Sequence, residues 1–543
     1  MKAHRVLAIG LDGYEESLER RLIEAGELPA LARLRTQSAR YLLDHGPAQR
    51  TGLAWEHLST GLAPNRSGRW AAVHFDPATY AVWQEGTSIE PFAARLKSRT
   101  VVFDAPYFDL KQAPRANGVV GWGAHDPGVS FAANPTALLA EFKARFGEYP
   151  AKNSIYCHAW PSANHSQEMG EALAHAVALR TGAARWLLGE RLPDWDLGIV
   201  VVSEPHSAIE GLWHGVDETH PLHRLPSAGP ARHGLVAVYR AVDRLVGELT
   251  AAFADATVVV FSMGGMGPNR SDVASMVLLP ELLYRYAFGR PYLRQPDAWT
   301  SVTEMGPQLS DQEGWAEAVN ANLSPDISSH SARRMVARLL PEFVKNTLRG
   351  EVRPDPCTEK TPLRHSISWM PATRYQHHWR RMRAFALPSF YDGRIRINLT
   401  GRERNGTVRI SQYETVCDEI EAILRECRDP ATGKEVVDYI ERTRDSDPLT
   451  MGPTESDLIV VWKGMACAID HPRLGRLGPV PFRRPGGHTG QFGMAYICNS
   501  EMAAGDRGVR SSFDVVPTLV ELLGEPVSPG LSGTSLLTTT PVT

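Results

Sequence analysis

The chain has 543 residues, which is too long for one small core and predicts one large domain with insertions, or two or three domains. Its hydrophobic content of 43% and charged content of 22% are those of an ordinary globular enzyme. The formal net charge of -3 excludes a general nucleic-acid binder, because such a protein needs a basic excess to neutralise phosphates.

The six cysteines are scattered along the chain, and none of them forms a CxxC pair. We therefore expect buried free thiols, with no zinc knuckle, redox dithiol or disulfide framework. The first apolar run, residues 6–9, is too short for the apolar part of a signal peptide, and no later run is long enough to span a bilayer. These features predict a cytoplasmic protein that has no membrane partner.

Short β-branched runs alternate with amphipathic stretches along the chain. This alternation predicts an α/β fold with a mostly parallel central sheet sandwiched by helices. In chain order, the expected strands are residues 5–10, 100–103, 198–203, 257–262 and 457–462. The expected helices are residues 135–146, 166–188 and 233–253, and a short closing helix stops before Gly524.

The middle of the chain differs from this pattern. Residues from about 295 to 378 lack clean periodicity and are rich in Pro, Arg and Ser, with helical pieces around 332–348. Regular structure resumes at residues 393–399. We therefore expect residues 1–290 to form the first part of an α/β core, residues 291–385 to form an inserted cap or smaller subdomain, and residues 386–543 to complete the core.

Three of the expected strands are followed by polar or glycine-rich residues. Asp12 follows the first strand, residues 203–206 follow the strand at 198–203, and residues 262–265 follow the strand at 257–262. Ligands of α/β sheets bind beyond the carboxyl ends of the strands. The three segments together therefore favour one composite site over three unrelated loops.

Asp12 and Thr51 are the candidate catalytic residues. A carboxylate at a strand end is well placed to bind a hard metal ion, but Asp12 is equally well placed to cap a helix that begins near Glu15. Thr51 precedes a helical stretch, and a helix N-terminus stabilises both an alkoxide and a bound phosphate. The alternative for Thr51 is a simple N-cap.

His206 and Glu210 are the first candidate metal ligands. Because they are four residues apart, one helical turn would direct both toward the same ion. His488, in the segment RPGGHTG, is a candidate third ligand on a flexible loop. Two imidazoles and a carboxylate suit zinc, manganese or iron, and we expect zinc.

The chain resembles the type I phosphodiesterases and nucleotide pyrophosphatases of the alkaline phosphatase superfamily, over nearly its whole length and in the same order. The similar segments are Leu11-Asp12-Gly13, Thr51 leading to Leu58-Ser59-Thr60-Gly61, GWGAHDP at 121–127, Glu204-Pro205-His206 with Trp213-His214, residues 397–403, and residues 514–524. The resemblance implies an alkaline phosphatase-like fold and two metals that flank a Thr or Ser nucleophile. We expect His125 and Asp126 either to line the pocket or to form a turn.

The resemblance also implies which residues bind each metal. One ion takes His206, Glu210 and His488. The other takes Asp12, Thr51 and an adjacent Asp-His pair, whose positions are occupied here by Met263 and Gly264. Glycine has no side-chain ligand and a thioether is a poor ligand for zinc, so we expect one ion, with two possible if Asn269, Asp272 or substrate oxygens supply ligands.

These residues support three hypotheses. The first is metal-dependent hydrolysis of a phosphodiester or nucleotide-like substrate, in which Thr51 attacks phosphorus and Asp12 orients Thr51 or takes its proton. The second is a diverged tailoring enzyme with a single metal that catalyses phosphoryl or sulfuryl transfer, or a non-hydrolytic elimination or cyclisation, in biosynthesis. The third is a non-catalytic binding protein, against which Asp12, Thr51 and the three-ligand set argue. The first two take a small-molecule phospho- or sulfo-ester and no nucleic acid.

Overall fold

The computed structural model describes residues 5–154, 162–300, 302–310, 313–323, 364–443, 447–499 and 502–538. The chain forms two compact units. Unit 1 comprises Met1–Ala72, Gly86–Asn269 and Arg484–Thr543, and unit 2 comprises Val73–Glu85 and Arg270–Arg483. The expected division at 290/291 and 385/386 therefore needs correction, because residues 386–483 belong to unit 2. The helical pieces expected around 332–348 lie outside the described residues.

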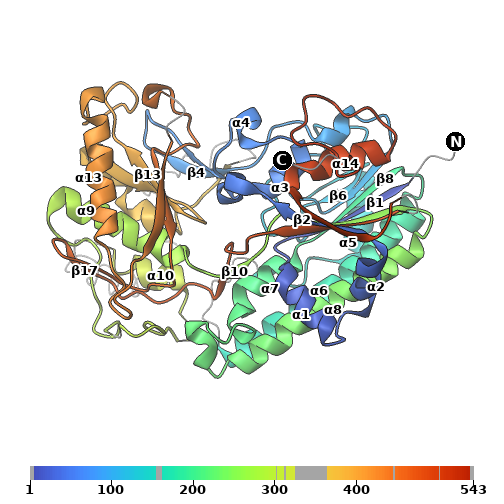
Figure 1. The fold of residues 1–543 in the computed structure, drawn as a ribbon, viewed down its shortest axis with the longest axis horizontal. Coiled ribbons are helices and arrows are strands. Elements are labelled where there is room, and N and C mark those ends of the chain that lie inside the picture. Colours follow the sequence, from blue (N-terminus) through green and yellow to red (C-terminus); the bar gives the residue numbers. More distant parts are fainter. Residues whose placement is uncertain are drawn as a thin grey trace, which may run out of the picture. The chain divides into compact units, whose positions relative to one another are not determined.

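Unit 1 is built on a nine-stranded sheet within the described residues (Figure 1). In spatial order its strands are β20 (Gly505–Ser511), β2 (Ala39–Asp44), β19 (Gly493–Cys498), β9 (Thr257–Ser262), β1 (Val6–Leu11), β8 (Leu197–Val202), β5 (Thr100–Phe103), β6 (Asn117–Val120) and β7 (Ala132–Asn134). All of them run parallel except β19 and β7, which are antiparallel to their neighbours. This sheet confirms the predicted α/β fold with a mostly parallel centre.

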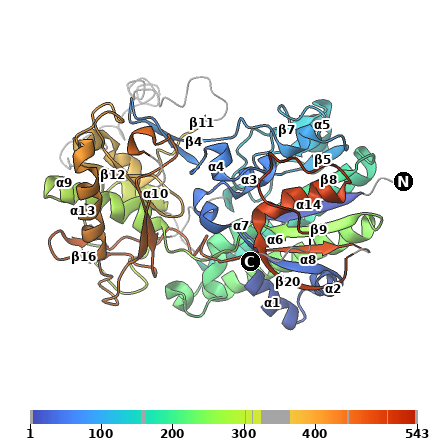
Figure 2. The ribbon, with the colours of Figure 1, turned by 45° about the horizontal axis from the view of Figure 1, so that its top comes forward.

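Helices cover both faces of the sheet, and each face has its own apolar core. Successive residues of β1 point to opposite faces, so Leu7, Ile9 and Leu11 join one core, while Val6 and Ala8 join the other. Figures 1 and 2 show α6 and α8 on one face and α14 on the other. The helices of unit 1 are α1 (Glu16–Glu24), α2 (Pro29–Gln37), α3 (Ala54–Thr60), α4 (Pro64–Ser67), α5 (Ala137–Phe146), α6 (Ala163–Trp186), α7 (Glu204–Leu212), α8 (Ala228–Ala252) and α14 (Val515–Leu522).

The strands that were easiest to predict are the buried ones at the centre of the sheet. All six residues of β1 and of β8 are buried, as expected for parallel strands covered on both faces. The four strands expected at 5–10, 100–103, 198–203 and 257–262 are present with ends shifted by at most one residue. The three long helices and the closing helix are also confirmed, with ends shifted by a few residues.

Unit 2 has its own sheets. The strand expected at 457–462 is β15 (Leu458–Trp462), and it lies in a four-stranded antiparallel sheet with β12 (Ala384–Leu387), β13 (Gly393–Ile397) and β14 (Val437–Arg442). A second sheet holds β3 (Val73–Phe75), β4 (Val82–Glu85) and β11 (Arg364–His365), and β16 (Ile469–His471) pairs with β17 (Gly475–Leu477). The helices of the unit are α9 (Leu279–Phe288), α10 (Trp315–Asn320) and α13 (Tyr413–Arg425). Because residues 384–462 pair among themselves, they form a unit apart from the central sheet.

Two smaller expectations concern the cysteines and the membrane. The cysteines among the described residues, Cys417, Cys427, Cys467 and Cys498, are free thiols. Within the described part of the chain, every helix is too short or too polar to cross a membrane.

Candidate metal centre

The candidate site residues emerge at one edge of the central sheet. β8 and β9 both run parallel to β1, so the carboxyl ends of these three strands meet at the same edge. Asp12 directly follows β1, and α7 begins two residues after the end of β8. β2 also points to this edge, because β19 is antiparallel to both β9 and β2. The turn that ends at Thr51 follows β2, so the topology delivers Asp12, His206 and Thr51 to one side of unit 1.

Helix α7 carries His206 and Glu210 on one face. Pro205, in its first turn, favours a helix start because its fixed φ suits the helix and its missing N–H would have no helical partner. One turn apart, His206 Nε2 lies 3.3 Å from Glu210 Oε1, and both side chains are buried. The ligand atoms of His206 and Glu210 therefore face the same point, as predicted for residues one turn apart.

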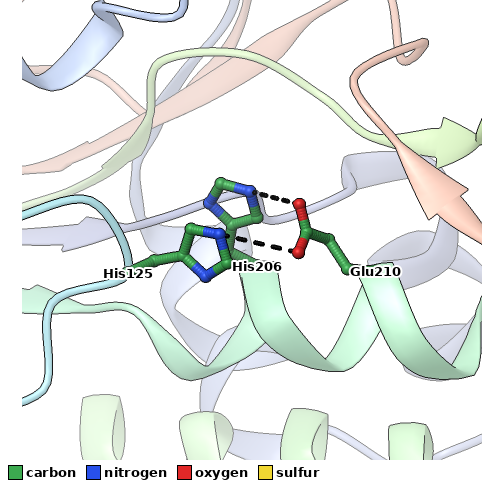
Figure 3. Close-up of side chains that lie close together, drawn as sticks. All are labelled: His125, His206 and Glu210. Carbon is green, nitrogen blue, oxygen red and sulfur yellow. Dashed lines mark ion pairs between the residues drawn. The ribbon is translucent and has the colours of Figure 1, made fainter. Parts of the chain in front are cut away.

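A second histidine, His125, joins this pair from a loop (Figure 3). His125 Nε2 lies 3.5 Å from Glu210 Oε2, and its ring stacks on that of His206 with centroids 3.8 Å apart. One ligand atom from each of His125, His206 and Glu210 lies within 4.8 Å of the others. Among the described residues, the buried Oε2 atom of Glu210 accepts no hydrogen bond and faces His125. This donor set fits a divalent transition metal such as zinc, manganese or iron.

Both histidines use one ring nitrogen for orientation and present the other to Glu210. His206 Nδ1 lies 3.1 Å from Asp12 Oδ2, and since a carboxylate only accepts, Nδ1 carries the proton. His125 Nδ1 lies 3.1 Å from the hydroxyl of Ser207. A metal-binding histidine is commonly held in this way, with its second nitrogen bonded to a carboxylate or another polar group. Asp12 therefore orients His206; it does not cap α1, whose N-cap is Glu15.

His488 is the third predicted ligand, and it also reaches His206. Its Nε2 atom lies 2.9 Å from His206 Nε2, with the two rings at 81°. Burial, with His206 and Arg484 nearby, lowers the pKa of His488 well below its usual value, so its imidazole is neutral. The side chain of Arg484 is 4% exposed and forms an ion pair with Glu210 Oε1.

The segment that carries His488 is held more firmly than a flexible loop. Strand β18 (Gly486–Gly487) pairs antiparallel with β10 (Gly267–Pro268). The carbonyl of Pro485 accepts from His220 Nε2 at 3.1 Å and from the backbone N–H of Asn269 at 2.8 Å. Gly486 allows a close approach to α7, because a Cβ there would lie 2.0 Å from the carbonyl oxygen of Ile209. The prediction of a flexible loop is therefore wrong for residues 485–487.

A buried ion network fixes the loop of His125 to the start of α7. Arg180, on α6, is fully buried and donates to Asp104 Oδ2 at 2.7 Å and to Glu204 Oε1 at 3.0 Å. Asp104 in turn accepts from the backbone N–H groups of Trp122 and Gly123, both at 2.8 Å. Burial alone would lower the pKa of Arg180, but the carboxylates of Glu204 and Asp104 raise it above its usual value, so Arg180 stays charged. The network therefore connects the two segments that carry His125 and His206.

Thr51 makes its own hydrogen bonds within its turn. Its hydroxyl donates to the carbonyl of Ala48 at 2.8 Å and accepts from the backbone N–H of Leu53 at 3.1 Å. It ends the 3-10 turn Gly46–Thr51, and the N-cap of α3 is Leu53. Thr51 is therefore not the N-cap of α3. These hydrogen bonds also do not connect it to the histidine cluster.

The positions expected to complete a second metal site offer no suitable ligand. Met263 is buried, and a Cβ built at Gly264 would have no described atom within 4 Å. The side-chain amide of Asn269 donates to the carbonyl of Gly486 at 3.2 Å. Asp272 belongs to unit 2, where its Oδ2 accepts from Arg483 at 2.7 Å. Met263 and Gly264 therefore supply no side chain that suits a second ion.

His125 is the site residue that the sequence left undecided. It lies in GWGAHDP, one of the segments similar to the family, but its spacing from His206 along the chain gives no geometric information. Gly121 and Gly123 are a further sign in the sequence that this segment is tightly packed. A Cβ at Gly123 would lie 2.3 Å from the ring of Tyr149, and Gly121 has a φ of 77°. Such glycines mark a tightly packed loop.

Comparisons with known proteins were made for the whole chain. The family model described as type I phosphodiesterase / nucleotide pyrophosphatase matches residues 6–332. A search of the curated proteins finds no match. Similar solved structures include phosphonoacetate hydrolase from Sinorhizobium meliloti 1021 in complex with phosphonoformate, with 14% identity and a TM-score of 0.47 over 96% of this chain and 95% of that chain. Another is human ectonucleotide pyrophosphatase / phosphodiesterase 5, with 11% identity and a TM-score of 0.48 over 97% and 96% of the two chains.

Proposed function

The chain belongs to the type I phosphodiesterase / nucleotide pyrophosphatase family, and from this premise we propose that it hydrolyses a phosphodiester or nucleotide-like substrate with Thr51 as the nucleophile. The family consists of metal-dependent phosphoester hydrolases, and the chain is an enzyme of this class. We assign one divalent metal, zinc in the first place, to His125, His206, Glu210 and His488. The observation that supports this assignment is that His125 and His206 both face the buried carboxylate of Glu210, while His488 Nε2 lies 2.9 Å from His206 Nε2.

The proposed reaction has two displacement steps. The Thr51 oxygen attacks phosphorus and the P–O bond to the leaving alkoxide breaks; the hydroxyl proton of Thr51 passes to Asp12 and from there to the alkoxide, which departs as the alcohol. Water then cleaves the phosphothreonine bond and restores the hydroxyl. Asp12 Oδ2 is bound to His206, so Oδ1 is the oxygen to which we assign the proton. A divalent metal, when bound at this site, supplies positive charge to the phosphoryl and leaving-group oxygens.

Thr51→Ala and Thr51→Ser test this proposal with bis(4-nitrophenyl) phosphate and zinc-loaded protein. We expect Thr51→Ala to lose turnover by at least about a thousandfold, because no nucleophilic oxygen remains. Thr51→Ser keeps the hydroxyl and serves as the matched control, with turnover within about tenfold of the original chain. Full activity of Thr51→Ala would exclude Thr51 as the nucleophile.

The second candidate function is a single-metal tailoring reaction: phosphoryl or sulfuryl transfer, or a non-hydrolytic elimination or cyclisation. The residues at 263 and 264 favour it, since neither supplies the ligand that a two-metal hydrolase needs. A panel of model phosphate and sulfate esters separates the two functions. Hydrolysis of any phosphodiester supports the first function, whereas a wholly negative panel with stoichiometric metal supports the second.

A further inference from the structure

Arg484 is the charged side chain nearest to the carboxylate of Glu210, and the proposed function gives it no role. Its guanidinium forms an ion pair with Oε1 of Glu210, and the two side chains are 4% and 1% exposed. The same oxygen lies 3.3 Å from His206 Nε2. A guanidinium and a metal-binding imidazole therefore converge on one carboxylate oxygen, out of contact with bulk water.

The backbone around Arg484 is fixed, so this position is built into the fold. Pro485 follows it directly, and the carbonyl of Pro485 accepts hydrogen bonds from His220 and Asn269. Gly486 then packs against the backbone of α7, the helix that carries Glu210. A flexible surface arginine would lose such an ion pair readily. Arg484, in contrast, is held near Glu210 because the paired strand β18 begins two residues after it.

Electrostatics makes Arg484 and a divalent cation competitors. Both are attracted to Glu210 Oε1, and a cation bound there repels a guanidinium at contact distance, strongly so in a buried site. Displaced from Glu210 but still tethered at Pro485, the guanidinium remains beside the site. Its planar array of donors matches the non-bridging oxygens of a phosphoryl group. Met263 and Gly264 contribute no charge, so the site needs positive charge from elsewhere.

We propose that Arg484 is the second cation of this site: it pairs with Glu210 in the metal-free protein, and with a metal on Glu210 it binds a non-bridging oxygen of the substrate phosphoryl group. This inference rests on the proposed function for the identity of the anion. It assigns to one arginine both the control of metal affinity and the recognition of phosphate.

Calorimetric titration of Arg484→Met tests both parts without turnover, first with Zn²⁺ alone and then with inorganic phosphate on the zinc-loaded protein. We expect zinc to bind about tenfold more tightly, because its competitor for Glu210 is gone. We expect phosphate to bind about tenfold more weakly, because a charge-assisted donor pair is lost. Arg484→Gln, a second neutral variant that keeps polar atoms, should behave in the same way if Arg484→Met folds poorly.

Two control variants make the result specific. Arg476→Met removes the same charge from an exposed pair with Asp470 in unit 2 and should change neither affinity. Arg484→Lys keeps the charge, so zinc affinity should stay within about threefold of the original chain while phosphate binding weakens. Unchanged or weaker zinc binding in both neutral variants overturns the proposal, as does unchanged phosphate binding. Because the titration needs no catalysis, inactivity of the original chain would count against the proposed function alone.

Discussion

His206 is the residue on which the proposed metal site depends, because each of its ring nitrogens faces a different partner. Nδ1 donates to Asp12 at 3.1 Å, and Nε2 points toward Glu210 and His488. The proton on Nδ1 leaves a lone pair on Nε2, which is the form that binds a metal. At the scale of single residues, we therefore expect Asp12 to control metal binding through the tautomer of His206.

Asp12→Asn tests this control. The amide can offer a donor to Nδ1, which favours a proton on Nε2 and removes the lone pair that the metal needs. We expect zinc affinity to fall about 10- to 100-fold, as is usual when the partner of a metal-bound histidine is changed. Calorimetric titration with Zn²⁺ measures the change, and an affinity equal to that of the original chain would rule out the orienting role.

Glu19 gives a prediction for the pH dependence of stability. It is fully buried on α1, where burial raises its pKa from 4.5 to about 8, although the hydroxyl of Tyr496 donates to it at 3.1 Å. The other charged or titratable groups around it are Arg35, Glu16, Asp243 and Tyr14.

Because its pKa is higher in the folded chain than in the unfolded one, Glu19 stabilises the fold only while it is protonated. Its contribution to the free energy of unfolding is fully present below about pH 4 and is lost as the pH rises through about 8, at about 1.4 kcal/mol per unit of pKa difference. Glu19→Gln removes this dependence. Urea denaturation should show the variant gaining stability relative to the original chain between about pH 5 and pH 9. A constant difference across that range would contradict the assignment.

At the scale of helices and strands, α6 and α8 meet at a pair of glycines. A Cβ at Gly170 would lie 2.3 Å from the Cα of Gly234, so the two backbones approach as closely as only glycine permits. The same helix α6 carries Arg180, and α7 packs beside it. The crossing therefore helps to set the position of the helix that carries His206 and Glu210.

Gly170→Ala should lower the free energy of unfolding by about 1–3 kcal/mol, because the added methyl group forces the helices apart. Gly182→Ala is the matched control in the same helix, since its nearest neighbour would lie 3.9 Å away. That change should raise stability by up to about 1 kcal/mol through helix propensity. Chemical denaturation distinguishes the two, and equal stability of the variants would contradict the close crossing.

At the scale of helices and strands, some elements could be predicted from the sequence and others could not. Strands β1, β5, β8 and β9 were predictable because burial on both faces leaves continuous apolar runs. The two-residue strands β10 and β18 carry no such pattern, so the fixed position of His488 could not be predicted. His206 and Glu210 were predictable because they share a helix, whereas His125 reaches them through tertiary contacts of Arg180 and Asp104.

For the whole molecule, the division into units could not be read from local patterns. β19 and β20 come from the end of the chain, yet β19 is inserted between β9 and β2. β15 has the same apolar character as the central strands but pairs within unit 2. Strand pairing depends on partners distant in sequence, so the boundaries expected at 290/291 and 385/386 were displaced even though the fold class was correct.

Metal binding should stabilise the whole chain, because the ligands converge only in the folded state. At a free zinc concentration of about 100 times the Kd, the gain is about 2.7 kcal/mol, visible as a rise in Tm. Glu210→Gln should lose most of this rise, since it removes the carboxylate that His125 and His206 face. A rise as large as that of the original chain would place the ion elsewhere.

In the function proposed here, one divalent metal held by His125, His206, Glu210 and His488 supports hydrolysis by Thr51. The most direct test of this function is the turnover of bis(4-nitrophenyl) phosphate while metal-free protein is titrated with Zn²⁺. We expect turnover to rise to a plateau at one equivalent of zinc per chain, and we expect Thr51→Ala to show no turnover at any loading. Turnover that appears only with a second equivalent, or no turnover at any loading, would contradict the proposed function.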